Sequence, residues 1–312
     1  MRLDSTRVAL VSCSDYEEIA LSRQISRVIA CLQNMGDLQA SRVLLKPNLI
    51  TASHGVLPCT QPEFIVAVAK WFVRQGAIVR IGDAPVFGTA HSALTRLGIT
   101  RDLAELGVEI TDFSRVSPLL ANGMVNPGLA ADALECDLLV NLPRVKAHAQ
   151  TRVTMAVKNY FGCLVGLRKP WWHMAHGGTA AGFADRLISL LEMLPDSLTL
   201  LDGITAMSRS GPVHGEPYSL GVLAACHNPV AIDRAMHAII RLDPRDSPLM
   251  LACQRHRFIG ANLPDLVFPL SSPLELSTDD FKVPQTLNPV RFNPCRFVRS
   301  TCKRILLRYL PW

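Results

Sequence analysis

Short apolar runs alternate along this chain with segments of helical periodicity, and this alternation limits the possible folds more than any other feature. Strands are predicted at residues 7–13, 43–46, 77–81, 108–111, 138–142, 198–201 and 220–225, and helices at 15–35, 62–75, 91–106, 151–161, 180–194 and 229–241. Alternating strands and helices imply a mainly parallel sheet with helices on both faces. The expected fold class is therefore α/β, built as one compact domain or as two closely joined lobes.

The chain changes character after Arg257, where it becomes Pro-rich and irregular. We expect an α/β domain over residues 7–257, followed by a Pro-rich segment and a basic amphipathic tail over 258–312. In the tail, apolar residues recur at helical spacing, and residues 291–312 hold six basic side chains and no acidic one. Such a helix can lie on an anionic membrane surface, or it can pack on the domain with its basic face in solvent.

Composition excludes several classes of protein. No stretch of the 312 residues approaches the roughly 18 apolar residues of a membrane span, and no signal peptide is recognised, so a cytoplasmic protein is expected, with peripheral membrane contact through the tail. The nine cysteines form no C-x-x-C pair, which favours reduced core thiols and no iron–sulfur cluster held by this chain alone. A net charge of +6 favours anionic ligands, but no nucleic-acid partner is predicted. The dinucleotide, P-loop, nucleophile-elbow and H-E-x-x-H motifs are missing from the sequence.

Unusual polar loops follow four of the predicted strands, at residues 46–48, 82–85, 143–148 and 202–203. The carboxyl ends of strands gather the ligand site in open parallel sheets, so these loops are expected to converge. Lys46 and Asn48 offer a cation and an amide to a ligand, although a solvated turn has the same pattern. Asp83 can orient a cation, a hydroxyl or a metal, or can form an ordinary Asx turn. The Gly-rich segment 211–215 looks like a hinge or lid over the same mouth.

The densest basic region runs from Lys146 to Gly178, and no acidic residue occurs between Asp137 and Asp185. Such a field attracts carboxylates or phosphates and lowers the pKa of a neighbouring lysine. Lys158 and Asn159 interrupt an apolar helical run, an expensive place for a cation without a role or partner. His173 and His176 have helical spacing for a metal, but without a carboxylate they are better read as polar surface or core residues, and no metal ligand is assigned.

The ordered segments VLLKPN, IGDAP, LVNLPRVKAHAQTRVTMAVKNYFG, LLDGITAM with GPVHGEP, and NPVAIDRA resemble the domain of unknown function 362 family over roughly residues 7–245. The resemblance implies a shared site, or its supporting shell, made of Lys46, Asn48, Asp83, Lys146, His148, Lys158, Asn159, Asp202 and Asp233. Members of the family often carry an added ferredoxin-like segment that binds four-iron four-sulfur clusters, and this chain lacks that cysteine pattern. A more distant similarity, to the amino-terminal part of the nickel-pincer lactate racemases, implies proton or hydride transfer on a small carboxylate.

The leading hypothesis is an enzyme that binds an anionic small molecule or an unidentified cofactor. Lys146, Lys158 and His148 are the candidate catalytic residues, with the lysines supplying charge stabilisation and the histidine transferring a proton. Cofactor binding is assigned to Lys46, Asn48, Asp83, Asn159 and Asp202. Redox chemistry with electrons from a separate electron-transfer protein is the favoured version. A cofactor-dependent racemase or isomerase, and a noncatalytic ligand- or metal-binding module, remain open.

Overall fold

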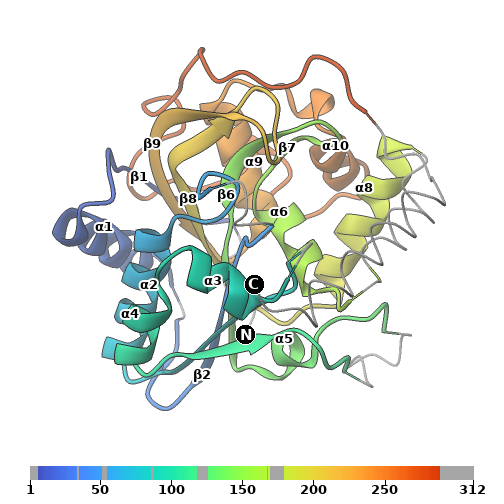
Figure 1. Ribbon diagram of the computed structural model, residues 1–312. Helices are drawn as coiled ribbons and strands as arrows, with labels where there is room; N and C mark the ends of the chain where they lie inside the picture. The colour runs from blue at the N-terminus through green and yellow to red at the C-terminus, as the bar shows by residue number, and fades with distance from the viewer. Residues whose placement is uncertain are drawn as a thin grey trace.

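A computed structural model describes residues 6–33, 35–50, 55–85, 88–117, 126–166, 168 and 179–288 (Figure 1). Its strands are β1 (Ala9–Ser12), β2 (Arg42–Pro47), β3 (Ile78–Asp83), β4 (Glu109–Asp112), β5 (Leu138–Leu142), β6 (Arg144–His148), β7 (Arg152–Thr154), β8 (Ser197–Ser208) and β9 (Glu216–Cys226). Its helices are α1 (Glu18–Ala30), α2 (Pro62–Arg74), α3 (Ala90–Arg96), α4 (Thr100–Glu105), α5 (Ala131–Glu135), α6 (Ala156–Asn159), α8 (Ala180–Ser189), α9 (Pro229–Ile239) and α10 (Pro248–Arg255).

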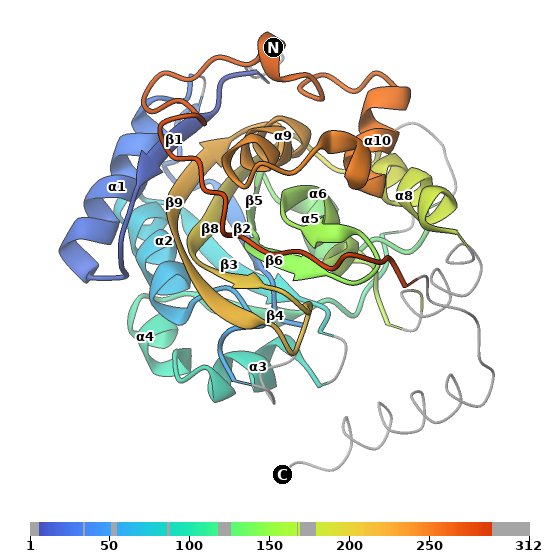
Figure 2. The same cartoon turned by 90° about the horizontal axis from the view of Figure 1, so that it is seen from above.

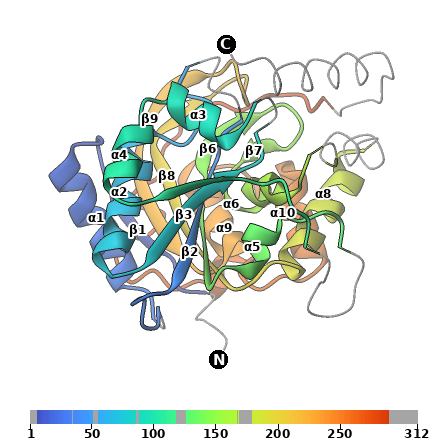
Figure 3. The same ribbon diagram turned by 60° about the horizontal axis from the view of Figure 1, so that its bottom comes forward.

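The strands form one sheet in the order β1-β9-β8-β5-β2-β3-β4, with β6 beside β8 and β7 beside β6. The run β8-β5-β2-β3-β4 is parallel, whereas β9 is antiparallel to both β8 and β1. Helices α1, α2 and α4 lie on one side of the sheet, and α8, α9 and α10 lie on the other (Figure 3). The predicted α/β class, with a mainly parallel sheet between two helical layers, is confirmed.

Both faces of the central strands are buried, and alternate residues of a strand enter different cores. Val43 and Leu45 of β2 belong to the cluster that contains Phe64 of α2, while Leu44 belongs to the cluster that contains Phe183 of α8. Side chains of a strand point alternately to opposite faces, so a strand between two helical layers needs apolar residues at every position. This requirement explains the continuous apolar runs in the sequence.

Three predicted segments differ in the structure. Residues 143–148 are mostly strand rather than loop, because Val145 and Ala147 alternate with polar residues and β6 hydrogen-bonds to both β7 and β8. Residues 202–203 form no loop, since β8 continues to Ser208 and pairs with β9 as a hairpin. The predicted helix at 151–161 begins with strand β7 and only then becomes the short helix α6 followed by a 3-10 turn.

The Pro-rich segment from residue 258 to 288 lies along the α/β fold. Val267 accepts a hydrogen bond from Val8 at 2.9 Å, and Ser271 donates to Leu10 at 3.1 Å, so the segment runs along β1. Residues 281–288, here called the strap, then cross over the β6–β7 hairpin (Figure 2). The backbone N–H of Asn288 donates to the oxygen of Ala149 at 2.7 Å, which ties the strap to the end of β6. The predicted amphipathic tail at 291–312 lies outside the described residues.

None of the helices in the described part of the chain is long and apolar enough to cross a membrane.

Candidate functional site

A buried ion pair joins the carboxyl ends of β2 and β3. The ammonium of Lys46 lies 3.0 Å from Asp83 Oδ1, and the side chains are 0% and 5% exposed. Lys46 also donates to the oxygen of Pro47 at 3.0 Å, while Asp83 Oδ2 accepts the backbone N–H of Leu49 at 2.9 Å. The two predicted residues therefore come together as expected for neighbouring parallel strands, and each also fixes the loop that follows β2.

Asn159 connects this ion pair to the other predicted residues. Its Oδ1 accepts from Asn48 Nδ2 at 2.9 Å and lies 3.5 Å from the Lys46 ammonium. Its own amide nitrogen donates to Asn141 Oδ1 at 2.7 Å and to the backbone oxygen of Lys46 at 3.3 Å. Sequence reasoning missed Asn141, which is fully buried in β5. Its amide interrupts an apolar run, and a polar side chain in such a run signals a polar partner nearby.

Lys146 reaches the same place from β6. It is 1% exposed, and its ammonium donates to Asn48 Oδ1 and, at 2.8 Å, to the oxygen of Pro58. Burial lowers its pKa to about 7, and the positive charges of Lys158 and Arg144 act in the same direction. Both of these acceptors are neutral, and no carboxylate pairs with Lys146 directly among the described residues.

Lys158 projects from α6 and is only partly exposed. Its ammonium lies 5.7 Å from the centre of the Phe161 ring, and burial lowers its pKa to about 8. No carboxylate or hydrogen-bond acceptor contacts this ammonium within the ranges that the structure describes. We call Lys46, Asn48, Asp83, Lys146, Lys158 and Asn159 the lysine centre.

Asp233, on α9, holds the start of α6. Its two carboxylate oxygens accept the backbone N–H groups of Ala156 and Val157 at 2.7 and 3.1 Å. Burial raises the pKa of Asp233 to about 7, although the two amide contacts oppose that shift. The residue thus belongs to the layer beneath the lysine centre. One turn later on α9, the ring of His237 is buried, and its Nδ1 lies 2.6 Å from the backbone oxygen of Asp233.

His148 ends β6 and shapes the turn into β7. Its Nδ1 accepts the backbone N–H groups of Gln150 at 3.0 Å and Thr151 at 3.3 Å. A nitrogen that accepts two amide protons carries none itself, so the neutral imidazole holds its proton on Nε2. The side chain is 8% exposed. The predicted proton-transfer atom is therefore Nε2, while Nδ1 has a structural role.

Asp202 lies in a neighbouring network rather than in direct contact with the lysine centre. It is fully buried, accepts from the hydroxyl of Tyr16 at 2.7 Å and from the N–H of Gln61 at 3.1 Å, and lies 3.9 Å from Arg144 Nε. Arg144 in turn donates to the oxygen of Cys59 at 2.8 Å. Asp202 thus anchors the segment before α2, the same segment that supplies an acceptor to Lys146.

Gly162 is a residue of the site that sequence reasoning did not identify. A Cβ added there would lie 2.4 Å from the Lys46 ammonium and 2.5 Å from Asp83 Oδ1. The backbone at this position therefore covers the ion pair so closely that a side chain has no room. The signal in the sequence was only its closeness to Lys158 and Asn159.

The glycine segment at 211–215 joins β8 to β9 and lies against β6. A Cβ on Gly211 would meet the oxygen of Ala147 at 1.8 Å, and the N–H of Ala149 donates to Gly211 at 3.3 Å. The segment therefore lies beside His148 and the strap.

No group of three or more histidine, cysteine or acidic side chains is arranged for a metal ion among the residues that the structure describes. The cysteines at positions 13, 31, 59, 136, 163, 226 and 253 are free thiols. His173 and His176 lie outside the described residues, as do Cys295 and Cys302.

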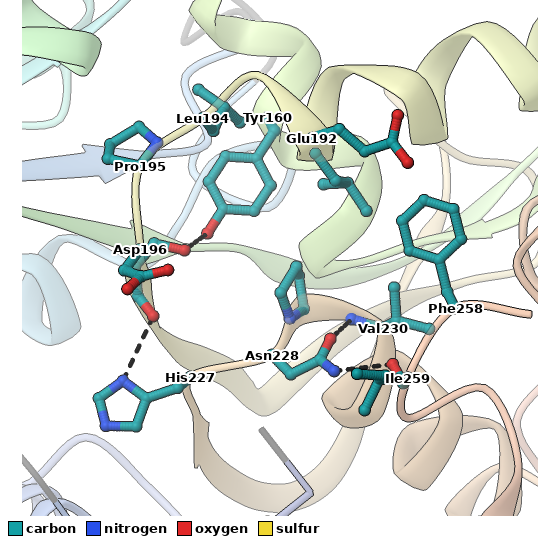
Figure 4. Close-up of a pocket in the computed structure, with 13 residues that line it drawn as sticks. Tyr160, Glu192, Leu194, Pro195, Asp196, His227, Asn228, Val230, Phe258 and Ile259 are labelled. Atoms are coloured by element: carbon teal, nitrogen blue, oxygen red, sulfur yellow. Dashed lines mark hydrogen bonds between the residues drawn. The ribbon is translucent and has the colours of Figure 1, made fainter. Parts of the chain in front are cut away.

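A pocket of about 440 Å³ lies at the opposite edge of the sheet, where β8 begins and β9 ends (Figure 4). It contains no residue of the lysine centre. The hydroxyls of Tyr160 and Ser197 bond each other at 2.6 Å, and the side chain of Asn228 accepts from Val230 and donates to Ile259. These polar groups are engaged with one another, so the pocket assigns no ligand.

Comparisons with known proteins agree with the resemblance seen in the sequence. The family model named domain of unknown function (DUF362) matches residues 43–238, which include all six residues of the lysine centre. The "Thylakoid-associated protein sll1697" of Synechocystis sp. is 36% identical over 309 residues, covering 97% of this chain and 95% of that protein. A crystal structure of a Thermotoga maritima protein aligns at a TM-score of 0.36 and 10% identity, over 67% of this chain and 56% of that one. The chain therefore belongs to the domain of unknown function 362 family.

Proposed function

We propose that the lysine centre binds an anionic small molecule and that the protein is an enzyme acting on it. The observation that carries this proposal is an imbalance of charge. Asp83 neutralises Lys46, and Asp202 lies beside Arg144, but Lys146 and Lys158 have no carboxylate partner in the described structure. Two cationic side chains in a poorly solvated place favour an anion that neutralises them.

The lowered pKa values give this binding a definite pH dependence. Lys146 and Lys158 lose protons near pH 7 and pH 8 because burial disfavours the charged form. A bound carboxylate or phosphate stabilises the ammonium and raises both pKa values. Binding should therefore take up protons and tighten as the pH falls from about 9 towards 7.

Titration calorimetry with oxalate and inorganic phosphate, at constant ionic strength, tests the proposal. Lys146→Ala and Lys158→Ala should each weaken binding of the true class of anion about tenfold or more, as expected when one charge-assisted contact is lost. Lys70→Ala is the matched control, because Lys70 pairs with Glu18 on the surface. Thermal melts check that each variant is folded. Unchanged affinity in both variants of the centre would refute the site.

The reaction itself divides into three testable versions. Redox chemistry would need electrons from a separate electron-transfer protein, because the sequence has no C-x-x-C motif. Racemisation or isomerisation of a small carboxylate would need only a bound cofactor, and a binding module would need neither. Anaerobic purification followed by metal analysis and absorption spectroscopy separates these versions. A chromophore supports the first two, while a colourless protein that binds anions tightly supports the third.

We also propose that the protein associates with a membrane surface through its carboxyl-terminal tail. Two observations support this: the relative from Synechocystis sp. is named as thylakoid-associated, and residues 291–312 hold six basic side chains and no acidic one. Each basic residue near an anionic bilayer contributes about 1 kcal/mol. Sedimentation with anionic vesicles at low salt should capture the full chain but not one that ends at Asn293. Equal, negligible sedimentation of both would contradict the proposal.

A further inference from the structure

The three amines of the lysine centre differ in their availability for chemistry. Lys46 is fully buried and paired with Asp83. Lys146 is also almost fully buried, and two of its three ammonium protons are donated to oxygens, which leaves one for a ligand. Lys158 is partly exposed, and in the described part of the chain its ammonium contacts the ring of Phe161 but no hydrogen-bond acceptor. Of the three, Lys158 alone has an amine that can react with a ligand without first losing a hydrogen bond of the described structure.

A lysine acts as a nucleophile only when its amine is neutral. The amines of Lys46 and Lys146 already donate to oxygen acceptors, which compete with a carbonyl carbon for them, and a carboxylate bound beside Lys146 would stabilise its ammonium form. Lys158 lacks such acceptors, and burial lowers its pKa to about 8. More of Lys158 is therefore neutral near pH 7 than of an ordinary lysine, which favours attack on a carbonyl.

The backbone that carries Lys158 is fixed on both sides. Asp233 holds the N–H groups of Ala156 and Val157, just before it. The next residue, Asn159, is held by hydrogen bonds to Asn48 and Asn141. An amine on such a segment approaches a ligand from one direction, which is what nucleophilic catalysis requires.

Lys146 lies close enough to Lys158 for the charge of one to lower the pKa of the other. A ligand between them would meet a cation that is held in place and an amine that is free to react. A small acid that also carries a carbonyl has one group for each. Its carboxylate would pair with Lys146, and its carbonyl carbon would face Lys158.

Building on the anion site proposed above, we propose that Lys158 forms an imine with the aldehyde or ketone of a small oxo acid whose carboxylate is held by Lys146. The Lys158 nitrogen adds its electron pair to the carbonyl carbon, and the carbonyl oxygen takes up a proton to give a carbinolamine. The nitrogen gives up one proton on forming the carbinolamine; the hydroxyl group then takes up a second proton and leaves as water, and the nitrogen gives up its other proton as the carbon–nitrogen double bond forms. One amine and one carbonyl thus give one imine and one water, with no change of oxidation state.

Reductive trapping tests this step on the full chain. The protein is incubated with pyruvate or glyoxylate and sodium cyanoborohydride, digested, and mapped by mass spectrometry. The peptide that contains Lys158 should gain the mass of the acid less one oxygen atom, well before Lys70 on the surface is labelled. Lys158→Arg should abolish that adduct, because a guanidinium keeps the positive charge but has no neutral amine for attack on the carbonyl. Lys146→Ala should reduce the adduct about tenfold by weakening capture of the carboxylate.

The outcomes separate this inference from the anion site on which it rests. Oxalate binding without an adduct on Lys158 would overturn the imine and leave the anion site standing. Labelling spread over the lysines in order of their exposure would overturn it as well. Failure of every acid to bind, in a protein that melts normally, would overturn both proposals.

Discussion

Gly162→Ala should damage the lysine centre without removing any of its functional groups. The new Cβ would lie 2.4 Å from the Lys46 ammonium and 2.5 Å from Asp83 Oδ1, far inside normal contact. Neither group can easily retreat, because both side chains are almost fully buried and hydrogen-bonded to the backbone around them. The substitution must therefore shift the 3-10 turn at Tyr160–Cys163 or separate the ion pair.

The size of the effect follows from these two routes. Overpacking a tight interior costs about 1–3 kcal/mol, and breaking a buried ion pair costs about 3–5 kcal/mol. Alanine recovers roughly 0.5–1 kcal/mol relative to glycine in a helical turn. We therefore expect the free energy of unfolding to fall by about 2–4 kcal/mol.

Urea unfolding followed by circular dichroism measures this difference. Gly98→Ala is the reference for backbone strain without a close contact: its Cβ meets no atom within 4 Å, and its φ of 80° adds a strain that Gly162, which has no left-handed φ, does not carry. This strain costs about 1–2 kcal/mol. If Gly162→Ala lost no more stability than Gly98→Ala, the close contact of Gly162 with the ion pair would be wrong.

Two further predictions concern buried groups outside the lysine centre. Burial raises the pKa of Asp233 to about 7 from its ordinary 3.8. Between these two pH values the carboxyl is protonated only in the folded state, so the free energy of unfolding falls as the pH rises. Burial lowers the pKa of His237 to about 4 from 6.5. Between these two pH values the imidazole is protonated only in the unfolded state, so the free energy of unfolding rises with pH. The free energy of unfolding, measured in urea across pH 4–7, should rise more steeply with pH in Asp233→Asn than in the wild type. In His237→Gln it should fall with pH relative to the wild type. Profiles parallel to the wild type would contradict both pKa shifts. Tyr16→Phe should lower the free energy of unfolding by about 1–3 kcal/mol, since the carboxylate of Asp202 and the N–H of Thr205 both lose a partner. An unchanged urea midpoint would show that Tyr16 does not hold this network.

The fold was predictable where local and global signals agreed. Pro62 begins α2 as expected from its fixed φ, and Gly76 adopts a φ of 79° just after the helix ends. The β6–β7 hairpin was not predictable in the same way, because its apolar residues fit a helical period as well as a strand. What decides in favour of strands is pairing with β8, a partner about 60 residues away in the sequence. Helix α10 was missed because no strand follows it to complete the alternation.

The same contrast holds for the lysine centre. Lys46 and Asp83 were predicted together because each ends a parallel strand, and such ends share one edge of the sheet. Asp202 was placed with them on the expectation that its strand ended at Leu201, but β8 continues to Ser208 and leaves Asp202 in mid-strand. The place of Asn141 in an apolar run signalled a polar partner, but neither that partner, Asn159, nor the contact of Gly162 with the ion pair could be identified from a local pattern.

The strap gives the end of the chain a fixed starting point. Arg152 donates to the oxygens of Pro284 and Gln285, the latter at 2.7 Å, and Asn288 is bonded to Ala149 beside the end of β6. Residues 289–312 therefore begin next to the strand that carries Lys146. A partner held by the tail, as proposed above, would be tethered to the protein instead of meeting it by diffusion, at an effective concentration on the order of millimolar for a short tether. Transfer of a ligand between such a partner and the proposed anion site would then be a first-order process, independent of how dilute the protein is.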